Sequence, residues 1–329
     1  MIKIIYITEN GSILAHKIKN ILKYYLYDCS IHNLKKFIIE GREKGFIFIM
    51  ATGIVIRKYI DKIKRDKRED PFVITVDEFG KYVVPMLSNH LGGGNYFSRL
   101  IGRELGSNVV FTTATDVNNK VGIDELSRIY FLEKPNREDI LKINRKILRE
   151  KVNLHLPKNW KLINNNLSNT YDITYHKENH VIVDNDIILN PKKIVVGIGC
   201  RKDIEPYKVY WTVKRALYLR DIPPWRIDGL ATVDIKKHEK GILKTGKKLN
   251  KRVYIISREE IINLYAQRKD LNKSYFVFKS IGVYGVSEPC SILGVNKLSN
   301  NYYEDKYNKI ELILKKLKNK GVTVSIAMD

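Results

Sequence analysis

Residues 83–116 read VVPMLSNHLGGGNYFSRLIGRELGSNVVFTTATD, and the N-terminal part of the chain is organised around this stretch. The apolar run 83–87 predicts a strand, and three consecutive glycines follow at positions 92–94. Apolar residues then recur at helical spacing from near Asn95, and residues 108–111 are again strand-like. The stretch therefore predicts a strand–helix–strand unit with polar residues at its turns.

The turn between the first strand and the helix combines groups suited to an anionic ligand. Glycines 92–94 allow a close backbone approach, and a helix N-terminus presents N–H groups and the positive end of a dipole. His90 precedes the glycines, and an imidazole with an ordinary pKa near 6.5 can exchange a proton near neutral pH. A purely structural role, in which His90 hydrogen-bonds a loop carbonyl, stays open on the sequence alone.

The first 87 residues alternate between strand-like and helix-like segments. We expect strands over 1–7, 46–50, 71–77 and 82–87, helices over 12–27 and 34–44, and turns at 10–12 and 78–81. Thr52 and Gly53 follow a buried strand, and the carboxyl edge of a parallel sheet is where ligands gather, although a plain turn also fits. Asp77 and Glu78 come at the end of another strand. Two roles fit them, either as a catalytic acid or base or as caps of the N–H groups in the turn.

The pattern weakens over the middle of the chain. Only a helix over 137–150 and short strands near 171–175 and 181–183 are predicted there. His176 and His180 are four residues apart, but their surroundings are typical of a hairpin, so no metal pair is expected.

The C-terminal part again alternates strands and helices. We expect strands over 193–201, 229–234, 253–256 and 321–327, helices over 206–220, 238–249 and 259–267, and a glycine-rich loop over 281–290. The Gly197–Gly199 pair lacks the third glycine of a dinucleotide-binding fingerprint. Cys200 and Cys290 border glycine loops, but no histidine lies nearby in sequence, which favours packing over nucleophilic catalysis.

These patterns predict the α/β class, as two α/β domains with mostly parallel sheets joined by a less regular middle segment. The predicted boundaries are 1–118 for the N-terminal domain, 119–192 for the middle segment and 193–329 for the C-terminal domain.

Charge and cysteine usage narrow the class of protein. The formal net charge of +23 has three open explanations, namely nucleic acid, a small polyanionic ligand, or a lysine-rich solvated surface. Nucleic acid is disfavoured because the positive charges are spread along the chain without a basic tail or finger motif. The three cysteines form no CxxC pair, and no apolar run approaches the roughly 20 residues of a membrane span. We expect a soluble, cytoplasmic protein without a membrane partner.

Several motifs occur together in a specific order along almost the whole chain. They are the segments 52–57 (TGIVIR), 76–80 (VDEFG), 87–95 (LSNHLGGGN), 112–116 (TTATD), 197–201 (GIGCR), 230–234 (LATVD) and 282–289 (GVYGVSEP). In this combination the chain resembles the CbiG family, the cobalt-precorrin-5A hydrolases of anaerobic cobalamin biosynthesis. Tyr284 and Ser287 depart from the expected pattern, in which a glycine and a Cys or Ser would stand.

The resemblance implies a hydrolase that opens the δ-lactone of cobalt-precorrin-5A and releases acetaldehyde to give cobalt-precorrin-5B. Cobalt is then expected only within the substrate, with no cofactor and no protein-bound metal. An anionic, carboxylate-rich tetrapyrrole suits a basic protein with glycine loops at helix N-termini. Other enzymes of the cobalamin pathway are further candidate partners, the oligomeric state is open, and no nucleic-acid partner is expected. A non-catalytic tetrapyrrole carrier and, less favoured, a basic nucleic-acid-binding protein are the alternative functions.

On that basis the candidate catalytic residues are His90 as general base and Asp116 and Glu288 as orienting carboxylates. The N–H groups of Gly92, Gly93 and Gly94 are the expected donors to an oxyanion or carboxylate. Three cations are expected to pair substrate carboxylates, namely Arg57, Lys81 and Arg201. The remaining candidate substrate-binding residues are Thr52, Gly53, Ser88, Asn89, Asn95, Thr113 and Gly199.

Overall fold

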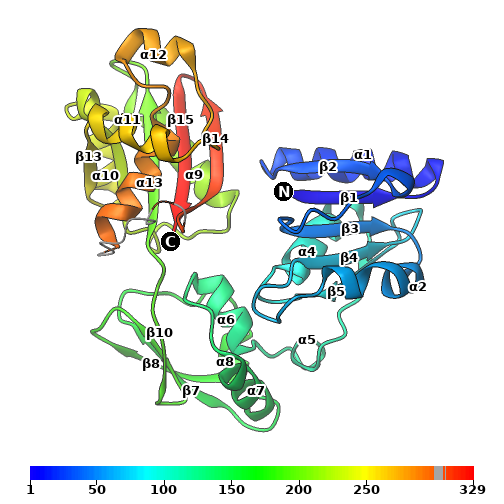
Figure 1. Cartoon of the computed structure of the whole chain (residues 1–329). Coiled ribbons are helices and arrows are strands. Elements are labelled where there is room, and N and C mark those ends of the chain that lie inside the picture. Colours follow the sequence, from blue (N-terminus) through cyan, green and yellow to red (C-terminus); the bar gives the residue numbers. More distant parts are fainter. Residues whose placement is uncertain (300–306, 308) are drawn as a thin grey trace. The chain divides into compact units, whose positions relative to one another are not determined.

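The computed structural model describes residues 1–299, 307 and 309–329. The chain divides into two compact units, Met1–Pro191 and Lys192–Asp329 (Figure 1). The unit boundary falls at the predicted start of the C-terminal domain, whereas the boundary predicted near residue 118 lies inside the first unit. The division into three domains stays a prediction. Strands and helices alternate along the chain in both units, which confirms the α/β class.

The N-terminal sheet has six strands in the order β2-β1-β3-β4-β5-β6. Their bounds are Ile2–Tyr6 for β1, Cys29–Asn33 for β2, Gly45–Ile49 for β3, Phe72–Val76 for β4, Tyr82–Leu87 for β5 and Asn108–Val109 for β6. Strands β3 and β4 are buried along their whole length, as expected for continuous apolar strands covered on both faces.

The helices within residues 1–118 mostly follow the predicted pattern. They are α1 (Glu9–Tyr24), α2 (Thr52–Val55), the π-turn η2 (Ile56–Ile60), α3 (Asp61–Ile63), α4 (Gly94–Leu105) and α5 (Ala114–Val117). Two predictions are wrong. A turn was predicted over 10–12, but these residues lie inside α1. That helix already begins at Glu9, because the Thr8 side chain caps it by accepting a hydrogen bond from the Gly11 N–H. The helix expected over 34–44 is only the 3-10 turn η1 (Leu34–Lys36), which follows strand β2.

One reversal divides the two edges of the N-terminal sheet. Strands β1, β2, β3 and β4 run parallel. Strand β5 pairs with β4 in the antiparallel sense, and β6 is parallel to β5. The carboxyl end of β5 therefore lies at the edge opposite to the carboxyl ends of β3 and β4.

The middle of the chain contains a second sheet, with the order β10-β9-β7-β8 (Figure 1). Its strands are β7 (Val152–Pro157), β8 (Tyr171–His176), β9 (Val181–Val183) and β10 (Ile187–Leu189), accompanied by helices α6 (Ile123–Tyr130), α7 (Arg137–Lys146) and α8 (Leu167–Thr170). Strands β8 and β9 match the predicted pieces, whereas β7 was not predicted. Both β8 and β9 pair with β7, so the hairpin expected between them is wrong.

The second unit is built on a five-stranded sheet with the order β13-β12-β11-β15-β14. Its strands are β11 (Ile194–Cys200), β12 (Gly229–Val233), β13 (Val253–Ile256), β14 (Glu311–Asn319) and β15 (Val322–Met328). Its helices are α9 (Pro206–Tyr218), the 3-10 turn η3 (Asp234–Lys236), α10 (Lys240–Leu249), α11 (Arg258–Gln267), α12 (Tyr275–Ile281) and α13 (Ser287–Leu298). Residues 287–290 thus begin a helix, whereas a loop was predicted.

Helix α13 packs unusually close to strand β11. A Cβ atom on Gly197 would overlap the backbone carbonyl of Ser287, and one on Gly294 would lie 2.6 Å from Cγ1 of Val195. Residues Ser287–Val295 are all buried. Only glycine at both positions permits this contact, which fixes the position of the first turn of α13. None of the described helices is long and apolar enough to cross a membrane.

The substitution Gly197→Ala should destabilise the second unit by about 3 kcal/mol, because the added methyl group meets backbone that cannot rotate away. Gly53→Ala is the matched control, since nothing lies within 4 Å of a Cβ at that position. The control should leave stability unchanged or raise it by about 0.5–1 kcal/mol, because alanine is the better helix former. Urea unfolding followed by circular dichroism measures both; equal midpoints would contradict the close packing.

Candidate active site

The strand reversal separates the candidate site residues of the first unit into two groups. Thr52, Gly53 and Arg57 follow β3, and Lys81 precedes β5, so all four lie at one edge of the sheet. Residues 88–95 follow β5 at the other edge. Thr52 and Gly53 therefore do not lie at the edge that carries His90. Thr52 contacts Thr75, with 3.1 Å between their Oγ1 atoms, and Arg57 and Lys81 are exposed.

The loop 88–93 needs its glycines for its own packing. A Cβ on Gly92 would overlap the Ser88 side chain, and one on Gly94 would lie 3.1 Å from Cα of Asn89. Gly93 has a φ of +88° as the N-cap of α4. Such a left-handed conformation favours glycine.

The N–H groups of the three glycines are already used inside this loop. The Gly92 N–H donates to Oγ of Ser88, the Gly93 N–H to the His90 carbonyl, and the Gly94 N–H to the Ser88 carbonyl. In this conformation the expectation of free amide donors is wrong. The hydrogen bonds instead hold the loop rigid and aim the His90 side chain.

His90 lies in a mostly buried polar cluster, which we call the His90 cluster: His90, Asn95, Thr113, Thr115, Asp116 and Glu125. His90 Nδ1 is 3.1 Å from Oε2 of Glu125 on α6. Its Nε2 is 3.5 Å from each of the Thr113 and Thr115 hydroxyl oxygens. His90 is 9% exposed, so little water reaches the imidazole.

Asp116 is fixed on the Nε2 side of the ring, where its Oδ2 is 3.8 Å from His90 Nε2. The carboxylate accepts hydrogen bonds from the Asn95 amide, at 2.7 Å, and from the Thr113 hydroxyl. Thr113 also caps α5 by accepting from the Asp116 N–H. The structure thus brings His90, Asn95, Thr113 and Asp116 together as predicted neighbours of one site.

Two arginines border the His90 cluster. Nη2 of Arg128 is 3.0 Å from Oε1 of Glu125. Arg99 lies over the Phe111 ring, with its Nη2 3.6 Å from Oδ1 of Asp116 and its Nη1 3.8 Å from Oε1 of Glu125. These Arg99 distances exceed those of good hydrogen bonds, and half of its side chain is exposed. Arg99 therefore keeps donor capacity for an approaching anion.

The carboxylates determine the protonation of the imidazole. Burial by itself lowers the pKa of His90, but the hydrogen bond to Glu125 and the charges of Asp124, Glu125 and Asp116 outweigh burial. The pKa of His90 is therefore raised above its ordinary value. Burial would raise the pKa of Glu125, yet Arg128 and His90 hold it well below its usual range. Glu125 is consequently an anion that accepts the Nδ1 proton and leaves Nε2 as the basic nitrogen.

Two buried acceptor atoms beside His90 have no hydrogen-bond partner among the described residues, namely Oδ1 of Asn89 and Oδ1 of Asn95. Buried polar atoms are normally paired, so unpaired acceptors at a candidate site favour a bound water or substrate donor. Asn95 is fully buried, and its amide group already donates to Asp116. Its oxygen is thereby oriented for a further donor.

Glu125 and Arg99 belong to the site, although they were not predicted from the sequence. Glu125 is 35 residues beyond His90, and no local motif links the two positions. A possible signal was the acidic pair 124–125 at the start of an amphipathic helix, but such pairs usually stabilise the helix dipole.

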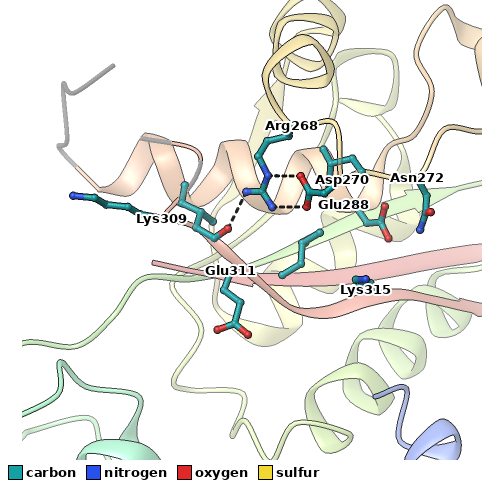
Figure 2. A pocket seen from close by; sticks show the side chains of 10 residues that line it. Arg268, Asp270, Asn272, Glu288, Lys309, Glu311 and Lys315 are labelled. Carbon is teal, nitrogen blue, oxygen red and sulfur yellow. Dashed lines mark hydrogen bonds and ion pairs between the residues drawn. The ribbon is translucent and has the colours of Figure 1, made fainter. Parts of the chain in front are cut away.

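Glu288 lies in the second unit. It lines a pocket of about 300 Å³ together with Arg268, Asp270, Asn272, Lys309 and Lys315, among other residues (Figure 2). Arg268 closes one wall through two hydrogen bonds to Asp270, of 2.7 and 2.9 Å, and one of 3.0 Å to the Ile310 carbonyl. Strand β14 is irregular here, with register shifts between Leu312 and Leu317. Bulges of this kind commonly accompany functional sites.

The carboxyl group of Glu288 is unusually deeply buried for an acidic side chain. The residue is 3% exposed, and its Oε1 has no hydrogen-bond partner among the described residues. Burial raises the pKa of Glu288, against the opposing charges of Lys316 and Lys315. A carboxyl group with a raised pKa holds its proton more firmly, which suits it to act as a proton donor.

The other candidate residues of the second unit lie at the end of β11. A Cβ on Gly199 would lie 2.7 Å from the Thr323 hydroxyl, so this glycine serves close strand packing. Arg201 is exposed. Burial raises the pKa of Cys200 to about 11, and Cys290 is fully buried with a pKa raised by burial. Neither thiol has the lowered pKa of a reactive nucleophile.

Together these features define an α/β protein with a buried histidine–carboxylate site suited to proton transfer. Comparison with family models identifies the group. Residues 39–116 match the model "Cobalamin synthesis G N-terminal" and residues 194–327 match "Cobalamin synthesis G C-terminus". The chain belongs to the CbiG family.

Relatives with curated names extend over most of the chain. A protein of Methanocaldococcus jannaschii named "Probable cobalt-precorrin-5A hydrolase" is 57% identical over 329 residues, covering 100% of this chain and 99% of the relative. The cobalt-precorrin-5A hydrolase of Priestia megaterium is 27% identical, covering 87% of this chain and 78% of the relative. That of Salmonella typhimurium is also 27% identical, covering 86% and 82%.

A solved structure has the same fold. The crystal structure of a cobalamin biosynthesis protein G homologue from Sulfolobus solfataricus aligns with a TM-score of 0.61 and 24% identity. The alignment covers 99% of this chain and 96% of the other.

Proposed function

We propose that this chain is a cobalt-precorrin-5A hydrolase, which opens the δ-lactone of cobalt-precorrin-5A and releases acetaldehyde to give cobalt-precorrin-5B. The observation that carries the proposal is the 57% identity to the M. jannaschii relative along the full length of both chains. The net charge of +23 supports an anionic, carboxylate-rich substrate.

The cobalt ion belongs to the substrate in this proposal, and the hydrolysis needs no cofactor of the protein's own. Lactone hydrolysis requires an activated water, a stabilised oxyanion and a proton for the leaving oxygen. All three can come from side chains. The described cysteines are free, which supports a cytoplasmic location, and other enzymes of the cobalamin pathway are candidate partners.

His90 is the proposed general base. Glu125 accepts the Nδ1 proton, so the neutral imidazole presents the Nε2 lone pair toward the side of Thr113, Thr115 and Asp116. A water bound on that side would lose its proton to Nε2 as it attacks the lactone carbonyl. The raised pKa makes His90 a stronger base than an ordinary imidazole.

Asp116 and Asn95 are the proposed positioning groups. Asp116 is oriented by Asn95 and Thr113, and it stabilises the imidazolium formed when His90 takes the proton. The unpaired Oδ1 of Asn95 can accept a hydrogen bond from the attacking water. Arg99 replaces the glycine N–H groups as the proposed donor to the oxyanion or to a substrate carboxylate.

Substitution of His90 by alanine should lower acetaldehyde release from cobalt-precorrin-5A by about 10²–10⁴-fold, the usual contribution of a general base. His155→Ala is the matched control, because His155 lies in the middle sheet with Nδ1 bound to Thr174 and Nε2 to Asn185. The control should turn over at the wild-type rate. A folded His90→Ala variant with wild-type turnover would rule out the assigned base, whereas wild-type binding without any acetaldehyde would indicate a carrier.

Glu288 is proposed as a proton donor of the pocket in the second unit, where it would act on substrate bound in that pocket. Glu288→Gln removes that proton and keeps the shape of the side chain, so turnover should fall about 10²-fold or more. Glu311→Gln is the control from the same pocket, since Glu311 is exposed. Equal single-turnover rates for Glu288→Gln and wild type would reject this role and leave the role of His90 untouched.

A further inference from the structure

The segment between β8 and β9 crosses the end of a strand. Because β7 lies between β8 and β9, residues 177–180 must pass over the carboxyl end of β7. His176, the last residue of β8, is in register with Pro157 at the end of β7, and its carbonyl accepts from the Lys158 N–H at 2.8 Å. This crossing folds the chain back and brings residues 176–180 close together.

Three potential metal ligands meet in the crossing segment. His176, Glu178 and His180 each offer one ligand atom, and these atoms all lie within 4.8 Å of one another. Nε2 of His180 is 3.3 Å from Oε2 of Glu178, and the two imidazole centroids are 5.2 Å apart. A single ion with bonds of about 2.0–2.2 Å to nitrogen and oxygen can bridge groups at such separations after small side-chain rotations.

An unpaired nitrogen in this group also indicates a ligand. Nε2 of His176 is buried and has no hydrogen-bond partner among the described residues. His155, in the same sheet, has protein partners within 3 Å on both ring nitrogens. The contrast matters because a buried imidazole nitrogen without a partner loses its hydration without compensation.

We propose that His176, Glu178 and His180 bind one divalent transition-metal ion of the zinc type, with water in the remaining position. Two imidazoles and one carboxylate suit Zn²⁺ or Co²⁺ and disfavour Mg²⁺ and Ca²⁺, which take oxygen ligands. The bound ion ties the end of β8 to the start of β9 across β7. The site is structural and separate from the proposed hydrolysis. It also lies between the two matched family ranges, 39–116 and 194–327.

The test uses the full-length protein after treatment with a chelator. One sample is titrated with Zn²⁺ alone and binding is measured by calorimetry, and a second sample is titrated with Co²⁺ and binding is measured by visible absorption. The wild type should bind one ion at this site, and its Co²⁺-loaded form should show the intense visible absorption that is typical of four-coordinate Co²⁺. His176→Ala and His180→Ala should each weaken the affinity by more than about tenfold and abolish that absorption. A tenfold excess of Mg²⁺ over Zn²⁺ should not compete.

His238→Ala is the control for adventitious surface binding, because His238 is exposed and lies in the second unit. It should leave the zinc affinity unchanged. Circular dichroism of each variant checks the fold. The proposal is overturned if the wild type gives no four-coordinate Co²⁺ spectrum, or if the folded double variant His176→Ala/His180→Ala binds Zn²⁺ as tightly as the wild type.

Discussion

The hydrogen bond between Glu125 and His90 is the interaction on which the proposed chemistry depends. It places an anion on Nδ1, which selects the tautomer with a basic Nε2 and raises the pKa of the imidazole despite burial. Arg128 keeps Glu125 ionised, and the N–H groups of the glycine loop hold His90 in place. Without the Glu125 carboxylate, only the charges of Asp124 and Asp116 would oppose burial, so the pKa of His90 would fall and the base would be weaker. The loop, α5 and α6 are thus parts of one site through this contact.

The antiparallel pairing of β4 and β5 determines where that site lies. It places the His90 cluster at the sheet edge opposite to the loop after β3, so Thr52, Gly53, Arg57 and Lys81 lie at the other edge. The glycines after β5 then serve a different purpose from the one their pattern suggests. They allow a tight loop whose N–H groups are satisfied internally, and in the proposed mechanism the substrate contacts are made by side chains such as Arg99 and Asn95.

Much of the fold could be predicted because continuous apolar runs identify buried strands such as β3 and β4, and helical spacing identifies α4. The direction of β5 was also implicit, since the connection 78–81 is too short for a parallel crossover. Strand β7 was missed because its alternating pattern is short, and the crossing after His176 cannot be told from a hairpin by local sequence. His90, Asn95, Thr113 and Asp116 come from motifs close in sequence. Glu125 does not, because only the tertiary fold brings α6 to the loop.

The most direct test of the central claim combines two titrations of the same protein. The pKa of His90 is read by NMR from its ring protons, and single-turnover acetaldehyde release from cobalt-precorrin-5A is measured across the same pH range. Because the base acts as neutral imidazole, the rate should rise with pH, with a midpoint equal to the His90 pKa and above about 6.5. In Glu125→Gln both midpoints should move together to lower pH. A rate that is independent of pH, or whose midpoint does not follow the His90 pKa in this variant, would contradict the assignment of His90 as a base tuned by Glu125.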